Sequence, residues 1–213
     1  MSVKLIWATP DADRMIASIA RVSNPANQDN PNIEGLLNYM MREGHVSPFE
    51  MVNACVEINT TRDIGRQILR HRSFSFQEFS QRYADVEALG KFEWRECRMQ
   101  DSKNRQSSLL CDDAKVITAW EDFQRNTWNE ANRRYKAALD MGIAKEQARA
   151  LLPEGLTPSR IYMNGTMRSW IHYLQSRLHE STQKEHQMIA QEILDILYEV
   201  APVTMKAFFN ETN

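Results

Sequence analysis

Residues 66–83 read RQILRHRSFSFQEFSQRY, a stretch that combines four arginines and one histidine with three phenylalanines and a tyrosine. Burying such polar groups costs free energy unless each one is paired. The stretch is therefore either a solvated basic face on a helix that runs into a strand, or a preformed site for a planar anionic ligand. Because the rigid guanidinium fork matches phosphates and carboxylates, arginine suits the second interpretation. The residues alone leave both open.

Crowding among the arginines bears on this choice. Arg66, Arg70 and Arg72 lie within two helical turns, with Glu78 and Arg82 close behind. Guanidinium groups that lie so close repel each other unless anions or carboxylates separate them. We therefore expect either acidic partners from elsewhere in the chain or a bound anion.

Hydrophobic periodicity on both sides of this stretch predicts the elements around it. We expect helices that begin at Thr9-Pro10-Asp11 and at Pro202, and a capping box of Thr182 and Glu185 that opens a helix through Tyr198. The other helices expected cover residues 33–43, 61–72, 114–140, 145–152 and 166–178. The strands expected cover residues 3–8, 52–58, 73–86, 92–99 and 159–164.

These elements predict the fold class and the domain organisation. We expect one α+β domain over residues 1–213, with a small, mostly antiparallel sheet packed against several helices. The long helix 114–140 carries Trp120, Phe123, Trp128 and Tyr135, which indicate a core or subunit interface rather than a base-stacking platform. The polar segment 101–113 is typical of a mobile insert or lid.

Composition excludes several classes of protein. The net charge of −2 argues against a dedicated nucleic-acid binder. Neither a charged leader nor an apolar span of membrane length is present, so we expect no membrane association and a cytoplasmic location, or the host cytoplasm for a viral protein. Cys55, Cys97 and Cys111 form no C-x-x-C motif, which argues against a disulfide framework and against zinc.

Three histidines in the C-terminal half of the chain recur at a regular spacing. His172, His179 and His186 recur every seven residues, but no carboxylate or cysteine lies at a matching spacing. We therefore expect no metal site.

One motif in the central stretch identifies a family resemblance. Arg70-His71-Arg72, followed after seven residues by Ser80, resembles the signature of the flavin-dependent thymidylate synthases. Other blocks resemble the same family in the same order, and together they cover about residues 20 to 200. These blocks are Arg21-Val22-Ser23, the run GHVSPFE at 44–50, the run ARALLP at 148–153, and Arg168-Ser169 through Arg177. The segment 87–135 carries no such signature.

The resemblance implies an enzyme that methylates deoxyuridine monophosphate (dUMP) to thymidine monophosphate (dTMP). Methylene-tetrahydrofolate would supply the carbon, flavin adenine dinucleotide (FAD) would carry the hydride, and NADPH would reduce the flavin. Each of these ligands bears phosphate or carboxylate, so an arginine-rich pocket follows from charge matching. The resemblance also implies a homotetramer with flavin between subunits and the long helix at the subunit interface.

Site residues follow from the resemblance by position. The flavin would contact one set of residues from one chain, and a second set from other chains would complete the flavin site. The first set is Arg70, His71, Arg72, Gln77 and Glu78, and the second is Ser23, His45, Ser47 and Glu50. The nucleotide would contact Gln67, Ser80, Gln81 and Arg82, with Arg149 and Arg177 added from a neighbouring subunit.

Three of these residues form the expected catalytic set: Arg177, Ser80 and His71. The resemblance places Arg177 against the uracil ring, where a cation would stabilise negative charge that develops on the pyrimidine. Ser80 lacks a positioned base, so we interpret it as a hydrogen-bond partner of the nucleotide rather than a nucleophile. A reduced flavin removes the need for a nucleophilic cysteine.

Some positions depart from the family pattern. Thr166 and His172 stand where other members have asparagine, and Ser181 stands where some have a flavin-contacting histidine, with His179 two residues earlier. Gln77 replaces an asparagine but keeps the amide.

Two alternatives for the function remain: a non-catalytic nucleotide- or RNA-binding protein, and a family member that retains only NADPH oxidation.

Overall fold

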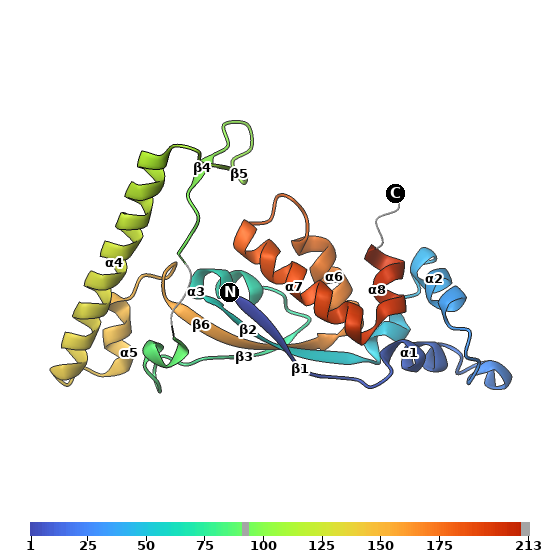
Figure 1. Ribbon diagram of the computed structural model, residues 1–213. Helices are drawn as coiled ribbons and strands as arrows, with labels where there is room; N and C mark the ends of the chain where they lie inside the picture. Colours follow the sequence, from blue (N-terminus) through green and yellow to red (C-terminus); the bar gives the residue numbers. More distant parts are fainter. Residues whose placement is uncertain (91–93, 210–213) are drawn as a thin grey trace.

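A computed structural model describes residues 1–90 and 94–209 and has an antiparallel sheet at its centre (Figure 1). The strand order is β1-β2-β6-β3, and every neighbouring pair is antiparallel. The strands are β1 (Ser2–Ala8), β2 (Asn53–Thr61), β6 (Pro158–Thr166) and β3 (Ser75–Glu78). The expected α+β fold with a small antiparallel sheet is confirmed.

One face of the sheet is buried and the other remains polar. Val52, Ala54, Val56 and Ile58 are all fully buried, as their alternation predicts. On the other face the Tyr162 hydroxyl donates to Glu57 at 2.7 Å. This alternation is what an antiparallel sheet covered on one side requires.

Helices from the second half of the chain cover the apolar face (Figure 1). They are α6 (Met167–Arg177), α7 (Lys184–Val200) and α8 (Pro202–Phe209). The short helix α3 (Arg62–Ile68), from the first half of the chain, packs against α7. Trp170 is fully buried, and its indole nitrogen donates to the Ala54 carbonyl at 3.2 Å. This bond anchors α6 to β2.

The segment between α3 and β3 packs onto β6 through a single glycine. A Cβ atom at Gly165 would lie 2.4 Å from the Phe74 ring, a distance that no side chain tolerates. Phe74 also contacts Trp170 edge to face, with ring centroids 4.6 Å apart. The position of the residues just before Phe74, including His71, is therefore set by core packing.

Two shorter helices close one end of the main part of the molecule, which we name the body (residues 1–90 and 141–209). They are α1 (Ala12–Ala20) and α2 (Glu34–Arg42), and both lie near α8. The buried Asp13 carboxylate accepts hydrogen bonds from the backbone nitrogens of Val203 and Thr204 at 2.8 and 3.0 Å, which caps the start of α8.

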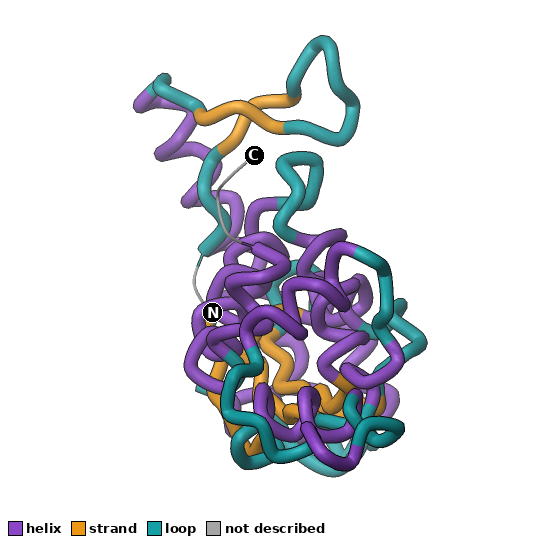
Figure 2. The backbone as a smooth tube through the Cα atoms, turned by 90° about the vertical axis from the view of Figure 1, so that its right-hand side faces the viewer, coloured by secondary structure: helices purple, strands orange, loops and turns teal. Residues whose placement is uncertain are grey.

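A second region, which we name the arm (residues 94–140), projects from the body (Figures 1 and 2). It comprises a hairpin of β4 (Arg98–Gln100) and β5 (Ser108–Leu110), followed by the long helix α4 (Ala114–Asp140). The Asp113 carboxylate caps α4 by accepting from the backbone nitrogen of Lys115 at 2.8 Å. The bounds of α4 are those the sequence predicts.

The C-terminal part of α4 packs against the body. Tyr135 is fully buried in a small cluster with Val86 and Ala148, the last residue of α5 (Lys145–Ala148). Trp120 and Phe123, nearer the start of α4, remain 38% and 65% exposed. The core role expected for the aromatic stripe therefore holds for Tyr135 and not for Phe123 within one chain.

Several expected boundaries are wrong. The helix expected to reach residue 72 ends at Ile68, and the strand expected over 73–86 is only β3, followed by turns and a 3-10 helix, Val86–Leu89. The first helix starts at Ala12 rather than Pro10, and 145–152 divides into α5 and a 3-10 turn. Of the strand expected at 92–99, residues 92 and 93 lie outside the described residues, and the strand begins at Arg98.

The expected capping box is also wrong, because both of its side chains have tertiary partners. α7 begins at Lys184, and the Thr182 hydroxyl donates to the Ser176 carbonyl at 3.3 Å instead of capping the helix. Glu185 binds Arg98 at 2.5 Å. The segment expected to be a mobile lid carries β5 and the turn of the hairpin.

The parts of the chain that the structure describes contain no helix long and apolar enough to cross a bilayer. Within the same residues, no cluster of three or more histidine, cysteine or carboxylate side chains is arranged to hold a metal ion.

Candidate functional site

Arg177 and His71 form the centre of the candidate site. Arg177 ends α6, His71 lies in the turn after α3, and the Arg177 Nε donates to the His71 Nε2 at 2.8 Å. A guanidinium only donates, so the His71 Nε2 carries a lone pair and the ring proton resides on Nδ1. Burial, reinforced by the cationic Arg177, lowers the pKa of His71 to about 4. His71 is therefore a neutral acceptor at physiological pH.

Aromatic rings hold the His71 ring in place. The His71 ring meets the buried Tyr173 ring edge to face at 4.9 Å, and Tyr173 in turn contacts Phe74 and Trp170. Phe74 and Trp170 belong to the core, so the site rests on closely packed buried side chains. A rigid base holds a binding group in place at low entropic cost.

The arginines of the central stretch divide into two groups. Arg66 binds Glu154 at 3.0 Å, and Arg82 binds Glu146 at 3.4 Å. Arg70 and Arg72 are exposed, and within residues 1–90 and 94–209 no carboxylate lies within ion-pair distance of either side chain. The repulsion that the sequence implies is relieved at Arg66 but not at Arg70 and Arg72. Such unneutralised guanidinium groups fit an anionic ligand.

The residues expected beside them on β3 have different environments. Gln77 is exposed, whereas Glu78 accepts a hydrogen bond from the Ser159 hydroxyl at 2.9 Å. The Glu78 carboxylate also lies 3.9 Å from Arg62 and 3.8 Å from Arg66. Glu78 thus contributes to the packing of α3 on the sheet.

The turn after β3 carries the residues expected to bind the nucleotide. The Ser80 hydroxyl accepts from the Arg82 backbone nitrogen at 3.4 Å. Gln81 is only 3% exposed, and its amide nitrogen has no partner among the described residues. An unpaired buried donor costs about 1–3 kcal/mol, so it fits an acceptor that a bound ligand supplies. Arg149 lies near Arg82 because Glu146 contacts both: its carboxylate binds Arg82 at 3.4 Å, and its backbone carbonyl accepts from the Arg149 Nε at 3.3 Å.

The other flavin residues expected lie on the surface of the body. Ser23 and His45 follow α1 and α2 and are exposed. Ser47 and Glu50 belong to a 3-10 helix, and the Glu50 carboxylate forms an ion pair with Arg168 at the start of α6. Their contact with a flavin therefore remains an expectation from the family resemblance.

The positions that depart from the family pattern have local roles. The Thr166 hydroxyl caps α6 by accepting from the Ser169 backbone nitrogen at 3.2 Å. The His179 Nδ1 and the Ser181 hydroxyl lie 2.8 Å apart beyond the end of α6, and His172 is exposed on that helix.

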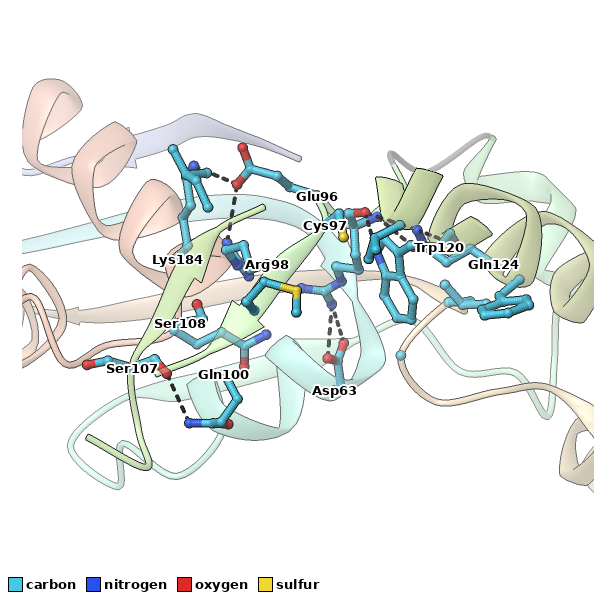
Figure 3. Close-up of a pocket in the computed structure, with 18 of the residues that line it drawn as sticks. Asp63, Glu96, Cys97, Arg98, Gln100, Ser107, Ser108, Trp120, Gln124 and Lys184 are labelled. Atoms are coloured by element: carbon cyan, nitrogen blue, oxygen red, sulfur yellow. Dashed lines mark hydrogen bonds and ion pairs between the residues drawn. The ribbon is translucent and has the colours of Figure 1, made fainter. Parts of the chain in front are cut away.

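A cleft of about 1280 Å³ separates the arm from the body beside this site (Figure 3). Its walls include Trp120 and Phe123 of α4, Arg95 and Arg98 of the arm, and Gln183 and Lys184 of the body. The Asp63 carboxylate binds Arg95 at 2.7 Å, and Lys184 binds Glu96 at 2.7 Å (Figure 3). The cleft therefore has one apolar aromatic wall and one ionic wall.

Sequence reasoning missed the residues that connect the cleft to the site. The Gln67 amide nitrogen donates to Gln183 at 2.7 Å, and Gln183 donates to the buried Glu185 at 2.9 Å. Tyr173 and His186 lie behind Gln67 and were not expected to take part. No local pattern identifies them, because their partners are more than ten residues away in the sequence.

Comparisons with known proteins identify one family. The family model described as "Thymidylate synthase complementing protein" matches residues 4–203. A flavin-dependent thymidylate synthase from Synechocystis sp. is 51% identical over 176 residues, which are 83% of this chain and 80% of the relative. A probable flavin-dependent thymidylate synthase from Paramecium bursaria Chlorella virus 1 is 44% identical and covers 97% of this chain and 98% of its own.

A solved structure shares the fold. The UMP/dUMP methylase PolB from Streptomyces cacaoi, bound with 5-Br dUMP, superposes with a TM-score of 0.83 at 28% identity. The match covers 97% of this chain and 93% of that one. The matched residues include Arg70-His71-Arg72 and Arg177, which the structure brings together. The chain belongs to the flavin-dependent thymidylate synthase family.

Proposed function

We propose that this chain is an FAD-dependent thymidylate synthase that methylates dUMP to dTMP. Methylene-tetrahydrofolate is the carbon donor and NADPH reduces the flavin. One observation carries the proposal: the Arg177 guanidinium is held by a neutral histidine instead of a carboxylate. Its positive charge is therefore left for a ligand, as a synthase that builds negative charge on a pyrimidine requires.

Within this proposal Arg177 and His71 act as a unit. His71 orients the guanidinium through one hydrogen bond, and the remaining guanidinium N–H groups face the uracil ring of dUMP. Negative charge that develops there as carbon 5 becomes nucleophilic is stabilised by this cation. Because His71 stays neutral, it does not compete for that charge.

Ser80, Gln81, Arg82 and Gln67 hold the nucleotide in this proposal. Arg149, which contacts Glu146 in the same chain as Arg82, joins this set instead of coming from a neighbouring subunit, whereas Arg177 is added from a neighbouring subunit. Gln81 supplies its unpaired amide nitrogen to a nucleotide acceptor, and Arg82 and Arg149, which meet at Glu146, supply charge for the phosphate. Ser80 contributes a hydrogen bond and not an attacking oxygen. Binding the phosphate at fixed donors orients the base toward Arg177.

The exposed, unneutralised Arg70 and Arg72 would hold the flavin pyrophosphate, with Gln77 and Glu78 beside the ring system. The surface residues Ser23, His45, Ser47 and Glu50 would complete that site from other subunits. When bound, the flavin supplies the hydride and carries the one-carbon unit.

We further propose a homotetramer. The exposed Trp120 and Phe123 face the cleft along α4, and the expected flavin residues of one chain lie on separate surfaces. Assembly of copies would cover the aromatic side chains and join those surfaces. A cytoplasmic location fits the three free cysteines, since a reducing compartment keeps thiols unpaired.

The test uses flavin-loaded protein with dUMP, methylene-tetrahydrofolate and NADPH, and dTMP is measured by chromatography. We expect dTMP to form, and Arg177→Ala to lower kcat/KM at least 100-fold, as loss of one charge-stabilising donor does elsewhere. Arg134→Ala, an exposed arginine on α4, is the matched control and should retain full activity.

Other outcomes separate the alternatives. Tight dUMP binding by protein that takes up no flavin and forms no dTMP would identify a non-catalytic nucleotide binder. NADPH oxidation without dTMP would identify a family member that has lost methyl transfer. Equal activity of Arg177→Ala and Arg134→Ala would remove Arg177 from the reaction.

A further inference from the structure

His186 is a fully buried titratable group near the site, and no step of the proposed function uses it. It lies in α7 with no exposed surface. Its ring contacts the Tyr173 ring at 5.7 Å and approaches the His71 ring at 6.4 Å. A buried imidazole costs free energy unless both nitrogens are paired, so its partners define its role.

Both ring nitrogens of His186 have partners. Nε2 lies 3.0 Å from the Tyr173 hydroxyl, and Nδ1 lies 3.3 Å from the Gln67 Oε1. Burial, together with the cation of Arg177 and the neighbouring His71, lowers the pKa of His186 to about 3. The ring is therefore neutral and carries one proton, which must reside on one nitrogen or the other.

A chain of hydrogen bonds decides where that proton resides. The Glu185 carboxylate only accepts, so the Gln183 amide nitrogen faces it at 2.9 Å and the Gln183 oxygen faces Gln67. The Gln67 amide nitrogen then donates to that oxygen at 2.7 Å, and the Gln67 oxygen faces His186. An amide oxygen only accepts, so the His186 Nδ1 carries the proton and Nε2 accepts from Tyr173.

Glu185 keeps this direction fixed because it stays ionised. Burial alone would raise the pKa of Glu185, but the Gln183 hydrogen bond and the charges of Arg95 and Arg98 bring it below its usual range. Arg98 binds the carboxylate at 2.5 Å and Arg95 at 3.1 Å. All donors in the chain therefore point toward Glu185.

We propose that His186 is a positioning residue: with Tyr173 it stabilises the orientation of the Gln67 amide that Glu185 sets, so that Gln67 offers an N–H group to the nucleotide. The inference rests on the proposed function, which makes Gln67 a nucleotide contact. The Gln67 nitrogen has two N–H groups, and Gln183 takes one. The other remains for a nucleotide acceptor.

Glu185 sets the direction of the hydrogen-bond chain at one end, and the Tyr173 hydroxyl supports that direction at the other end. Without that donor, His186 is free to move its proton to Nε2 and to place a lone pair against the Gln67 oxygen. That repulsion would oppose the Gln67 orientation that Gln183 and Glu185 favour, so the Gln67 N–H group would be offered to the nucleotide for a smaller fraction of the time. The buried hydroxyl thus helps Glu185 to hold the N–H end of Gln67 toward the nucleotide.

The experiment measures the Kd of dUMP and the kcat of flavin-loaded variants. We expect Tyr173→Phe to raise Kd about 5–10-fold and His186→Leu about tenfold, with kcat within about threefold, as for a lost orienting hydrogen bond. His186→Asn, which places an N–H near the position of Nδ1, should remain within about threefold of the parent. Tyr162→Phe, which removes a hydroxyl on the opposite face of the sheet, should leave Kd unchanged.

A double-mutant cycle with Gln67→Ala separates this inference from the proposed function. We expect Gln67→Ala to weaken dUMP binding and to abolish the effect of Tyr173→Phe. Once the Gln67 amide is removed, Tyr173 has no side chain through which it can affect nucleotide binding. If Gln67→Ala leaves Kd unchanged, the proposed nucleotide site is wrong. If Gln67→Ala weakens binding but Tyr173→Phe costs the same in both backgrounds, the function stands and the positioning role is refuted.

A measurement on the unmutated protein covers the case in which a variant does not fold. Two-bond ¹H–¹⁵N correlation spectra report which ring nitrogen of a histidine carries the proton. We expect His186 to be protonated on Nδ1 alone between pH 6 and 8. Protonation on Nε2, or on both nitrogens, would overturn the inference.

Discussion

Two glutamates in this molecule each bind two arginines. Glu185 lies in the body and Glu130 lies on the arm. Glu185 is 7% exposed and binds Arg95 and Arg98, which are nearly a hundred residues away in the sequence. Glu130 is 44% exposed and binds Arg133 and Arg134 within its own helix. In both cases the arginines lower the pKa of the carboxyl group, although burial opposes the shift more strongly at Glu185.

The same chemistry therefore has different structural consequences in the two places. At Glu130 solvent screens the charges, and the contact adds little to one turn of α4. At Glu185 the carboxylate holds the arm to α7 and terminates the hydrogen-bond chain that reaches Gln67. Burial, rather than the number of ion pairs, decides which contact matters.

The largest contrast between body and arm concerns aromatic side chains. We expect Trp170→Ala to lower the free energy of unfolding by about 4 kcal/mol, because it empties a fully buried site. Phe123→Ala on the arm should change the unfolding of the separated chain by less than about 0.5 kcal/mol. Urea unfolding measures both.

Phe123→Ala has a second expected result that tests the homotetramer. Removing this exposed ring should weaken assembly, which sedimentation velocity detects as a shift toward smaller species. A variant that assembles like the parent would exclude Phe123 from the subunit interface.

The two glutamates provide the next contrast. We expect Glu185→Ala to cost about 2 kcal/mol in unfolding free energy, since it removes the buried carboxylate that binds Arg98 at 2.5 Å and one of the two carboxylates that bind Arg95. Limited proteolysis should then cut more readily between residues 94 and 113, where the arm leaves the body. Glu130→Ala is the matched control and should unfold with the parent. Similar losses for the two variants would contradict the contrast.

Arg82 tests the nucleotide part of the site without touching the core. Its side chain is half exposed and pairs with Glu146, so Arg82→Ala should leave unfolding unchanged. We expect it to weaken dUMP binding by about 2 kcal/mol, as for a charged contact to an anion. Calorimetric titration measures this, with Arg125→Ala on α4 as the control. Unchanged affinity would remove Arg82 from the nucleotide site.

His71 gives a complementary result on the flavin side. We expect His71→Ala to reduce flavin-dependent turnover more than dUMP affinity, because Arg177 loses its orienting partner. Intact turnover would make His71 a structural residue only.

The smallest effect expected is a pH dependence of the unfolding free energy, which arises from two histidines of the body. The folded pKa values of His71 and His186, about 4 and about 3, lie below the ordinary value. As pH falls from 6.5 to 5.5 the unfolded chain binds protons that the folded chain does not, so stability falls. Each histidine should contribute a loss of about 1 kcal/mol over that range.

Chemical unfolding at several pH values checks this slope. His186→Asn should lose part of it, whereas replacement of the exposed His179 should not change it. A stability that is flat from pH 7 to 5.5 would show that neither histidine is held neutral by the fold.

Much of the framework follows from local sequence. The 3.6-residue hydrophobic period predicts both ends of α4, and strict alternation predicts the buried face of β2. The motif from Arg70 to Ser80 identifies the family. Each of these signals depends on residues within about one element of each other, where backbone geometry alone decides which side chains share a face.

The candidate site could be predicted only as a set of residue types. Nothing local pairs Arg177 with His71, 106 positions apart, or shows that Arg66 is neutralised by Glu154 while Arg70 is not. Thr182 and Glu185 match a capping box, yet tertiary partners outcompete the helix end for both side chains. Polar side chains choose among distant partners, and that choice has no period in the sequence.

The sequence by itself thus determined the family, the sheet and the long helix, because hydrophobic periodicity and a contiguous motif are encoded locally. The tertiary structure alone decided which arginines stay free for ligands, which histidines stay neutral, and how Glu185 joins the arm to the site. Those properties depend on burial and on charges brought together by the fold, and both are set by the whole chain at once.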